Sequence, residues 1–342
     1  MSINTLFILA FTIISYNVEN LFDARHDTLK NDIEYTADGS RHWSYVRYNN
    51  KVEQVSRVIC NIGGWDKPAL VGLCEVENDS CLLRLCRQMR RYPYRFIHFE
   101  SPDERGVDVA LLYDYTQFTP LDSMPLPVPL GTDRTRDILF VKGLILRAPR
   151  KHQCAFGATS IALCANNNVP LAQQQLPKAK DISQLSTLNS KLQKDTLYIF
   201  VSHLPSMLGG RAASEWKRQA AKDIIRHRVD SILTCQPSAY IVVMGDMNSA
   251  PQEDINGLTN KMLPLEQQGR GTHYYQGRWS CLDQFYVSPS LDSLAQVRIY
   301  DAPFLLTDDP QYLNTRPRRT FNGYHYDRDG YSDHLPIILS LP

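Results

Sequence analysis

Short apolar runs alternate with amphipathic stretches along nearly the whole chain. Several of the runs are rich in β-branched residues and are bounded by Gly, Pro or Asp, which is typical of strands. We expect strands at 11–16, 69–73, 94–99, 107–113, 138–146, 196–202, 239–244, 283–287, 295–300 and 336–341. Strands interleaved with helices over the whole length predict an α/β protein with large sheets.

Helical periodicity appears in the stretches between these runs. The expected apolar stripes consist of Val52, Val55, Ile59 and Ile62; of Leu82, Leu85, Cys86 and Met89; and, after Ser214, of Trp216, Ala220, Ile224, Val229 and Ile232. The third stretch is the clearest. We expect it to form a long helix with one broad apolar face.

One stretch, 148–194, interrupts this alternation. It is rich in Gln, Asn, Lys and Ser and contains one short apolar run at 161–164. Long loops are uncommon in compact domains and are usually lids, binding loops or disordered inserts. We expect a surface insertion within a single domain spanning 1–342, with a small hairpin that places Cys154 near Cys164 as one form it could take.

The run at 240–244 leads into Gly245, Asp246, Met247 and Asn248. Alternate residues of an extended chain point to the same side, so Asp246 and Asn248 can face one ligand. A carboxylate and a carboxamide suit a hard cation and a phosphate. A simple turn is the alternative, since Gly, Asp and Asn favour turns. An EF-hand calcium loop is excluded, because Pro251 stands where that loop needs glycine.

Four further runs end in polar groups that could hold a metal or a phosphate. They deliver Asn17, Glu75, His203 and the pair Asp333-His334. Taken singly, Glu75 could be a surface residue, His203 a buried structural histidine and Asp333-His334 a turn. Ligands bind at strand ends in α/β sheets, so five such ends together favour a functional site.

These segments resemble motifs of the endonuclease/exonuclease/phosphatase superfamily, also described as DNase I-like. They read S-Y-N-V-E-N-L-F at 15–22, L-C-E-V-E-N at 73–78, V-D-V-A-L-L-Y at 107–113, V-S-H-L-P-S at 201–206, M-G-D-M-N-S-A-P at 244–251, C-L-D-Q-F-Y-V-S at 281–288 and G-Y-S-D-H-L-P-I at 330–337. The resemblance implies a four-layer α/β/β/α sandwich of two mixed sheets. It also implies phosphate ester hydrolysis with a divalent cation, usually Mg²⁺, with Mn²⁺ or Ca²⁺ as alternatives.

The resemblance further assigns roles around the metal. Glu75 would be the principal metal ligand, with Asn17 beside it and Asp333 as a further or second-site ligand. Asp246 would orient or deprotonate the attacking water. Asn248 would hold a phosphate oxygen, and Asn17 would also contact the substrate.

Three more residues match the family's catalytic positions. His334 would contact the scissile phosphate, with Asp283 as its carboxylate partner, and His203 would protonate the leaving oxygen. An Asp that is hydrogen-bonded to a His favours the charged imidazole, so Asp283 should raise the pKa of His334.

Some positions depart from the family pattern. Glu19 stands where many nuclease members carry Asp, which leaves its role open, and no clear counterpart exists for the phosphate-contacting Tyr of abasic-site nucleases. Arg136 is expected to form a wall of the cleft, with a structural ion pair to Asp137 as the alternative. The segment 208–211 resembles a glycine-rich loop of some bacterial members, or it is only a turn before the helix.

Composition narrows the functional classes. The chain has 342 residues, 43% of them apolar, and a net charge of +1, which argues against broad, non-specific adhesion to nucleic acid but not against a local basic groove. Eight cysteines without a C-x-x-C pair indicate free thiols, most of them buried, rather than a disulfide framework or a zinc site. Arginines at 84, 87, 90, 91 and 95 are expected on the solvated face of a helix.

The N-terminal run at 6–14 has no Lys or Arg before it and is too short to span a bilayer. We interpret it as a buried strand with an apolar lead-in, and a cleaved export signal is the alternative. A soluble monomer, either cytoplasmic or exported, is therefore expected.

The fold and chemistry do not name the substrate. We favour DNA or RNA, because basic and aromatic residues near the catalytic segments could bind a backbone and stack on bases. They are Arg316, Arg318, Arg319, Tyr274, Tyr275 and Trp279. A small or lipid-linked phosphate, of the inositol phosphate or sphingomyelin type, is the second reading. A non-catalytic binding protein of the same fold is the third.

Overall fold

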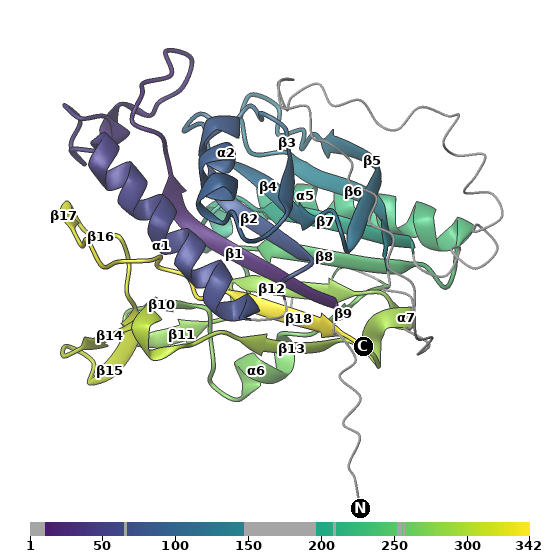
Figure 1. Ribbon diagram of the computed structural model, residues 1–342. Helices are drawn as coiled ribbons and strands as arrows, with labels where there is room; N and C mark the ends of the chain where they lie inside the picture. Colours follow the sequence, from purple (N-terminus) through teal and green to yellow (C-terminus); the bar gives the residue numbers. More distant parts are fainter. Residues whose placement is uncertain (1–10, 65–66, 147–195, 208–209, 252–254, 256) are drawn as a thin grey trace, which may run out of the picture.

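Two six-stranded sheets pack face to face, with helices on their outer faces (Figure 1). The computed structural model describes residues 11–64, 67–146, 196–207, 210–251, 255 and 257–342. Helices α1 (Tyr45–Gly63) and α2 (Asp79–Gln88) cover one sheet, and α5 (Arg211–Cys235) covers the other. This arrangement is the four-layer α/β/β/α sandwich expected from the sequence.

The first sheet contains the N-terminal and C-terminal strands of the described chain. Its order is β13 (Gln296–Ile299), β18 (Ile337–Leu341), β1 (Phe11–Leu21), β2 (Leu70–Val76), β4 (Asp108–Asp114) and β3 (Tyr94–His98). The pair β1/β2 is parallel and the other pairs are antiparallel, so the sheet is mixed.

The second sheet has the same mixed character. Its order is β5 (Phe118–Leu126), β6 (Ile138–Ile145), β7 (Thr196–His203), β8 (Tyr240–Asp246), β12 (Asp283–Val287) and β9 (Thr259–Asn260). Only β7/β8 is parallel. The sequence analysis missed β5, because Pro120 and Pro125 weaken its strand pattern. An edge strand tolerates them, since one of its sides needs no hydrogen-bond donors.

Apolar side chains from the facing strands fill the space between the sheets. Leu73, Val201, Met244 and Phe285 are fully buried there. Gly72 makes the close approach possible, because a Cβ at this position would lie 2.7 Å from the Met244 methyl group. A second core forms where α5 packs on the outer face of its sheet.

Caps explain where the two helices over the first sheet begin. Ser44 accepts a hydrogen bond from the Arg47 amide at the start of α1, and Asn78 accepts one from the Cys81 amide at the start of α2. The arginines at 84, 87, 90, 91 and 95 are all exposed, as predicted. Their assignment to one helix was wrong in part, because α2 ends at Gln88, so that Arg90 and Arg91 follow the helix and Arg95 lies in β3.

The apolar face predicted for the long helix α5 was partly wrong. Trp216 is 51% exposed, and the buried stripe instead runs through Arg218, Ala221, Ile225 and Val229. The stripe can include Arg218 because its guanidinium donates to the Pro205 carbonyl and the Ser214 hydroxyl. A hydrophobic pattern alone cannot show that an arginine will be buried by such hydrogen bonds.

Several predictions fall outside the described residues. They concern the insertion at 148–194, the pairing of Cys154 with Cys164, and the first part of the N-terminal run. The cysteines that the structure describes are free thiols. Within the described ranges, no helix is long and apolar enough to cross a membrane.

Gly245 is a position where the backbone requires glycine. Its φ is +136°, and a Cβ here would lie 1.8 Å from the Ser202 carbonyl oxygen of the neighbouring strand. We expect Gly245→Ala to lower the free energy of unfolding by roughly 3 kcal/mol, measured by urea denaturation. Gly269→Ala is the control, because Gly269 also has a positive φ but open space around it. Equal losses in both variants would contradict the steric explanation.

Candidate active site

The polar strand ends predicted from the sequence meet at one edge of the sandwich. In the first sheet Asn17 pairs with Cys74, which places it beside Glu75. In the second sheet Asp246 pairs with both His203 and Asp283. The two sheets are joined there by a hydrogen bond of 3.0 Å from Asn17 Nδ2 to Asp246 Oδ2.

Glu75 offers an oxygen to this edge. Its backbone has a φ of +67°, where the β2 ladder is irregular, and its Oε2 accepts a hydrogen bond of 3.0 Å from the Asn20 amide. Its Oε1 lies 3.7 Å from His203 Nε2 and 3.9 Å from an Arg105 nitrogen, beyond hydrogen-bond length. A fixed carboxylate with one oxygen directed at the site suits a hard divalent cation.

The other expected ligands have additional partners. Asn17 Oδ1 accepts a hydrogen bond from the Glu19 amide, and Asp333 Oδ2 accepts one of 3.1 Å from Arg319. Asp333 also lies with His273 and His334 in a group whose ligand atoms are all within 4.8 Å of one another. The residues present therefore fit a divalent cation, with Glu75 as the anionic ligand that has the fewest competing contacts.

Asp246 lies at the centre of the arrangement and is buried. Its Oδ1 accepts the Asn248 amide at 2.9 Å, and its Oδ2 lies 3.6 Å from His203 Nε2 and 3.8 Å from His334 Nε2. Burial raises the pKa of Asp246 to about 6, although the positive charge of His334 opposes this shift. The carboxylate is therefore a stronger base than an ordinary Asp and is mainly ionised at neutral pH.

His334 forms the predicted pair with Asp283, with 2.7 Å between Nδ1 and Oδ2. Burial lowers the pKa of His334, but the negative charges of Asp283 and Asp246 outweigh it and hold that pKa well above the usual value. The imidazole is therefore protonated at neutral pH, as expected from the sequence.

We expect His334→Gln to lower kcat by about 10²-fold, because a charged donor to the phosphoryl oxygens is replaced by a neutral one. Asp283→Asn should give a smaller loss, with the loss growing as pH rises and the unsupported imidazole deprotonates. Steady-state rates from pH 6 to 9 test this. A pH-independent effect of Asp283→Asn would show that the pair does not act through the charge of His334.

His203 is held in a different electrostatic environment. An Arg136 nitrogen lies 3.3 Å from its Nε2, and its Nδ1 is buried without a hydrogen-bond partner among the described residues. Burial, together with the charges of Arg136 and Arg105, places the pKa of His203 well below its usual value. The ring is neutral here, which does not favour the expected role of His203 as proton donor to the leaving oxygen, and that role stays an untested prediction.

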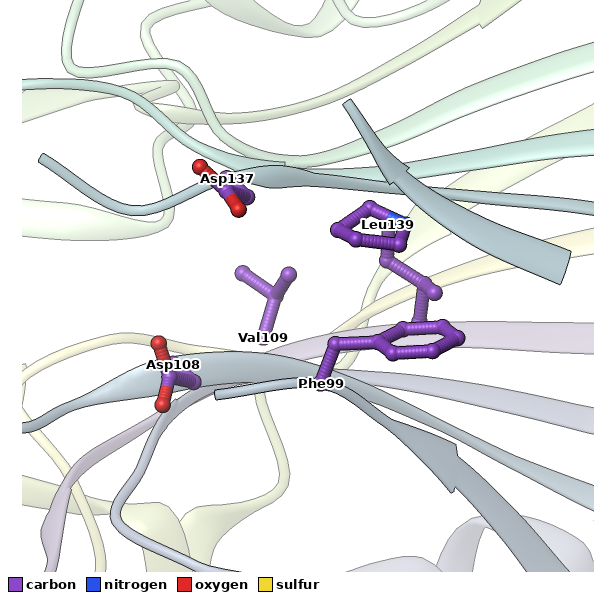
Figure 2. A pocket seen from close by; sticks show the side chains of 6 residues that line it. Phe99, Asp108, Val109, Asp137 and Leu139 are labelled. Atoms are coloured by element: carbon purple, nitrogen blue, oxygen red, sulfur yellow. The ribbon is translucent and has the colours of Figure 1, made fainter. Parts of the chain in front are cut away.

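Arg136 lies in the wall of the site. It is buried, and one guanidinium nitrogen lies 3.3 Å from Asp103 while another faces His203. Its ion-pair partner is thus Asp103, whereas Asp137 lines a separate small cavity (Figure 2). Arg136 thus lies beside the predicted site residue His203, and its roles in the cleft wall and in substrate contact remain predictions.

The geometry changes the interpretation of Asn248. The strand β8 ends at Asp246, and Asn248 has a φ of +46°, so strand alternation does not place the two side chains. Asn248 Nδ2 donates to the Leu204 carbonyl at 2.9 Å. The carboxamide is held at the site by this bond, which uses one of its two N–H groups, and contact with a phosphate oxygen stays a prediction.

Glu19 has a structural role. Its Oε2 accepts the Thr320 amide at 2.7 Å and lies 4.0 Å from the buried Lys51 ammonium. Burial and the charge of Asp333 raise the pKa of Glu19 to about 7, against the opposing effect of Lys51. The residue anchors the segment that carries Arg319, and its carboxylate is directed at backbone amides rather than at Glu75.

Three residues near the site gave no clear signal in the sequence. Arg105 lies 3.9 Å from both Glu75 and Asp103, and Ser332 donates to the Asn17 carbonyl at 2.7 Å. His273 packs on His334 with 4.8 Å between ring centroids. Arg105 and His273 do not stand at the end of an apolar run, so only long-range pairing brings them to the site. Ser332 directly precedes the predicted pair Asp333-His334 in the sequence.

The predicted base-stacking residues differ in accessibility. Tyr274 is buried against Trp279, with 5.2 Å between their rings, whereas Tyr275 is 67% exposed. Arg318 is engaged with Asp327 and Asp329, and Arg319 with Asp333. Tyr275 is therefore the one of these three aromatic residues that offers an open ring.

A sequence model of the Endonuclease/Exonuclease/phosphatase family matches residues 12–152 and 158–342. The interruption of this match falls inside the stretch 148–194. No curated protein sequence matched the chain.

Several solved structures share the fold. Truncated TDP2 of Caenorhabditis elegans is 13% identical, with 97% of each chain covered and a TM-score of 0.53. The catalytic domain of human Nocturnin, solved with a bound sulfate anion, is 15% identical, with 98% and 94% covered and a TM-score of 0.51. A mannosyl-6-phosphatase of Bacteroides thetaiotaomicron is 14% identical, with 97% and 99% covered and a TM-score of 0.51. At these identities the likeness establishes the DNase I-like fold.

Proposed function

Because the chain belongs to the endonuclease/exonuclease/phosphatase family, whose members hydrolyse phosphate esters, we propose that it is a Mg²⁺-dependent phosphodiesterase acting on DNA or RNA. One contact carries the proposal. The hydrogen bond between Asn17 and Asp246 joins the metal-binding side of the site to its hydrolytic side across the two sheets.

Glu75 would hold the cation with Asn17, and Asp333 would be a further ligand. When bound, the ion supplies positive charge that stabilises the phosphoryl oxygens. Asp246 would accept a proton from the attacking water, and the protonated His334 would donate to a phosphoryl oxygen. Asn248 would hold another oxygen of the same phosphate.

The surroundings of the site support a strand of nucleic acid as the substrate. His273 and Tyr275 share one face of β10 (His273–Tyr275), so the exposed Tyr275 side chain projects to the same side as the histidine that packs on His334. Arg41 lies over the rings of Phe321 and Tyr324, and Tyr324 is 73% exposed. Exposed aromatic rings combined with arginines are suited to stacking bases along a single strand.

Salt dependence tests the substrate class. If about three phosphates are contacted, KM for single-stranded DNA or RNA should rise about 20-fold between 50 and 200 mM salt. A bis-aryl phosphodiester has no condensed counterions to release, so its KM should change much less. A panel that also contains duplex DNA, inositol phosphates and sphingomyelin identifies the preferred substrate.

The balanced net charge of +1 favours the second candidate, a small or lipid-linked phosphate. Hydrolysis of that class together with the bis-aryl ester, and of no nucleic acid, would establish it. Cleavage of no member of the panel would instead support the non-catalytic reading.

A further inference from the structure

A second cluster of potential metal ligands lies where β3 meets β4 and shares no residue with the active site. It consists of His98 at the end of β3, Glu100 just beyond it, and Asp108 at the start of β4. One ligand atom from each lies within 4.8 Å of the others. Because His98 pairs with Ala110 across the ladder, His98 and Asp108 project from the same face of the sheet.

Two atoms of this cluster are buried without hydrogen bonds. The side chains of His98 and Asp108 are 2% and 1% exposed, and His98 Nε2 lies 3.6 Å from Asp108 Oδ2. Neither atom has a hydrogen-bond partner among the described residues. Such buried polar atoms are rare, because they lose their water without compensation. Their separation is close to the distance of about 3.3 Å between two ligands of a tetrahedral zinc ion.

The remaining atoms of both side chains are held in place. His98 Nδ1 lies 2.9 Å from Asp79 Oδ1, so the imidazole can donate there and present a lone pair at Nε2. Asp108 Oδ1 accepts hydrogen bonds from the Ser101 amide and hydroxyl, which leaves Oδ2 directed at His98. A carboxylate that orients a histidine through Nδ1 is the usual arrangement behind a metal-binding imidazole.

The surrounding charge favours a cation. Asp108 also lines a small cavity, with Asp137 on the opposite sheet (Figure 2). Asp79, Glu100, Asp108 and Asp137 are thus all close to the cluster, and the nearby Lys30 ammonium is bound to the carbonyl oxygens of residues 101 and 103. Without a metal ion, a protonated His98 would supply the positive charge that balances Asp79 and Asp108.

We infer that His98, Asp108 and Glu100 bind one divalent transition-metal ion, with Zn²⁺ preferred, and that Asp79 orients His98. One imidazole and two carboxylates suit zinc, whereas Mg²⁺ prefers an all-oxygen set. The ion would tie β3 and β4 to the start of α2, outside the hydrolytic site. This role is structural and does not depend on the proposed substrate.

Equilibrium dialysis of the chelator-treated full chain against Zn²⁺, in excess Mg²⁺, tests this site. Wild type and Glu75→Gln should each bind one zinc ion at this site with equal affinity. His98→Gln should lose at least tenfold in affinity for that ion, and Asp79→Asn roughly 10- to 100-fold. Hydrolysis of a bis-aryl phosphodiester with Mg²⁺ should remain within about twofold of wild type in His98→Gln, as a check that the variant is folded.

Equal zinc binding by His98→Gln and wild type would overturn the inference, as would loss of all zinc binding in Glu75→Gln. If His98→Gln does not fold, Glu100→Gln decides, since Glu100 is exposed and its replacement should be tolerated. Unchanged zinc affinity in Glu100→Gln would then assign the cluster to a protonated His98. Zinc binding by a wild-type protein that hydrolyses no phosphodiester would count against the proposed function alone.

Discussion

Asp246→Asn is expected to lower kcat roughly 10³- to 10⁴-fold while KM changes little, because the proposed base for the attacking water would be lost and the shape of the site kept. The carboxylate is well placed for this role. It is buried, it accepts hydrogen bonds from Asn17 and the Asn248 amide, and burial raises its pKa to about 6. Initial rates with saturating substrate and Mg²⁺ measure the effect.

The same residue predicts the acid side of the pH profile. A base whose pKa is about 6 is protonated at lower pH, so wild-type activity should fall as the pH drops through 6. Asp246→Asn should lack this dependence in its residual activity. Asp122→Asn, at an exposed position on β5, is the matched control and should behave like wild type. An unchanged acid limb in Asp246→Asn would assign that ionisation to another group.

Removal of divalent metal should lower activity by about 10⁴-fold, since the proposed cation would account for several kcal/mol of charge stabilisation in the transition state. Mg²⁺ added back to the chelated protein should restore the rate. Glu75→Gln replaces the anionic oxygen beside Asn17 with a neutral one. We therefore expect it to need far more Mg²⁺ for half-maximal activity, which a metal titration of the rate measures.

Glu77→Gln is the matched control for Glu75→Gln. Glu77 lies two residues further along the same segment, where its carboxyl group accepts the Asp23 amide. Burial raises the pKa of Glu77 to about 8, so the carboxyl is mainly neutral at pH 7 and an amide resembles it. The Mg²⁺ concentration that Glu77→Gln needs for half-maximal activity should match that of the wild type. Full activity of the wild type after exhaustive chelation would contradict a metal-dependent mechanism.

The segments that sequence analysis identified best were those with strong local patterns. Periodicity located most strands of both sheets, and the polar strand ends identified Asn17, Glu75, His203 and Asp246 as candidates. The hydrophobic pattern gave the wrong element or the wrong buried face where tertiary contacts outweigh the local preference for a strand or a helix. The edge strand β5 contains prolines, and the buried face of α5 contains Arg218, whose head group finds backbone and side-chain oxygens.

By itself the sequence determined the alternation of strands and helices and the residue types of a hydrolytic site, because these depend on local periodicity and on which side chains end each strand. Only the tertiary structure decided how those side chains are used. It assigned Arg136 to Asp103 and His203 rather than to Asp137, directed Glu19 to the Thr320 amide, and brought His273 against His334. The physical reason is that hydrogen bonds, burial and charge at this edge arise between strands far apart in the chain, and no local pattern records which of them meet.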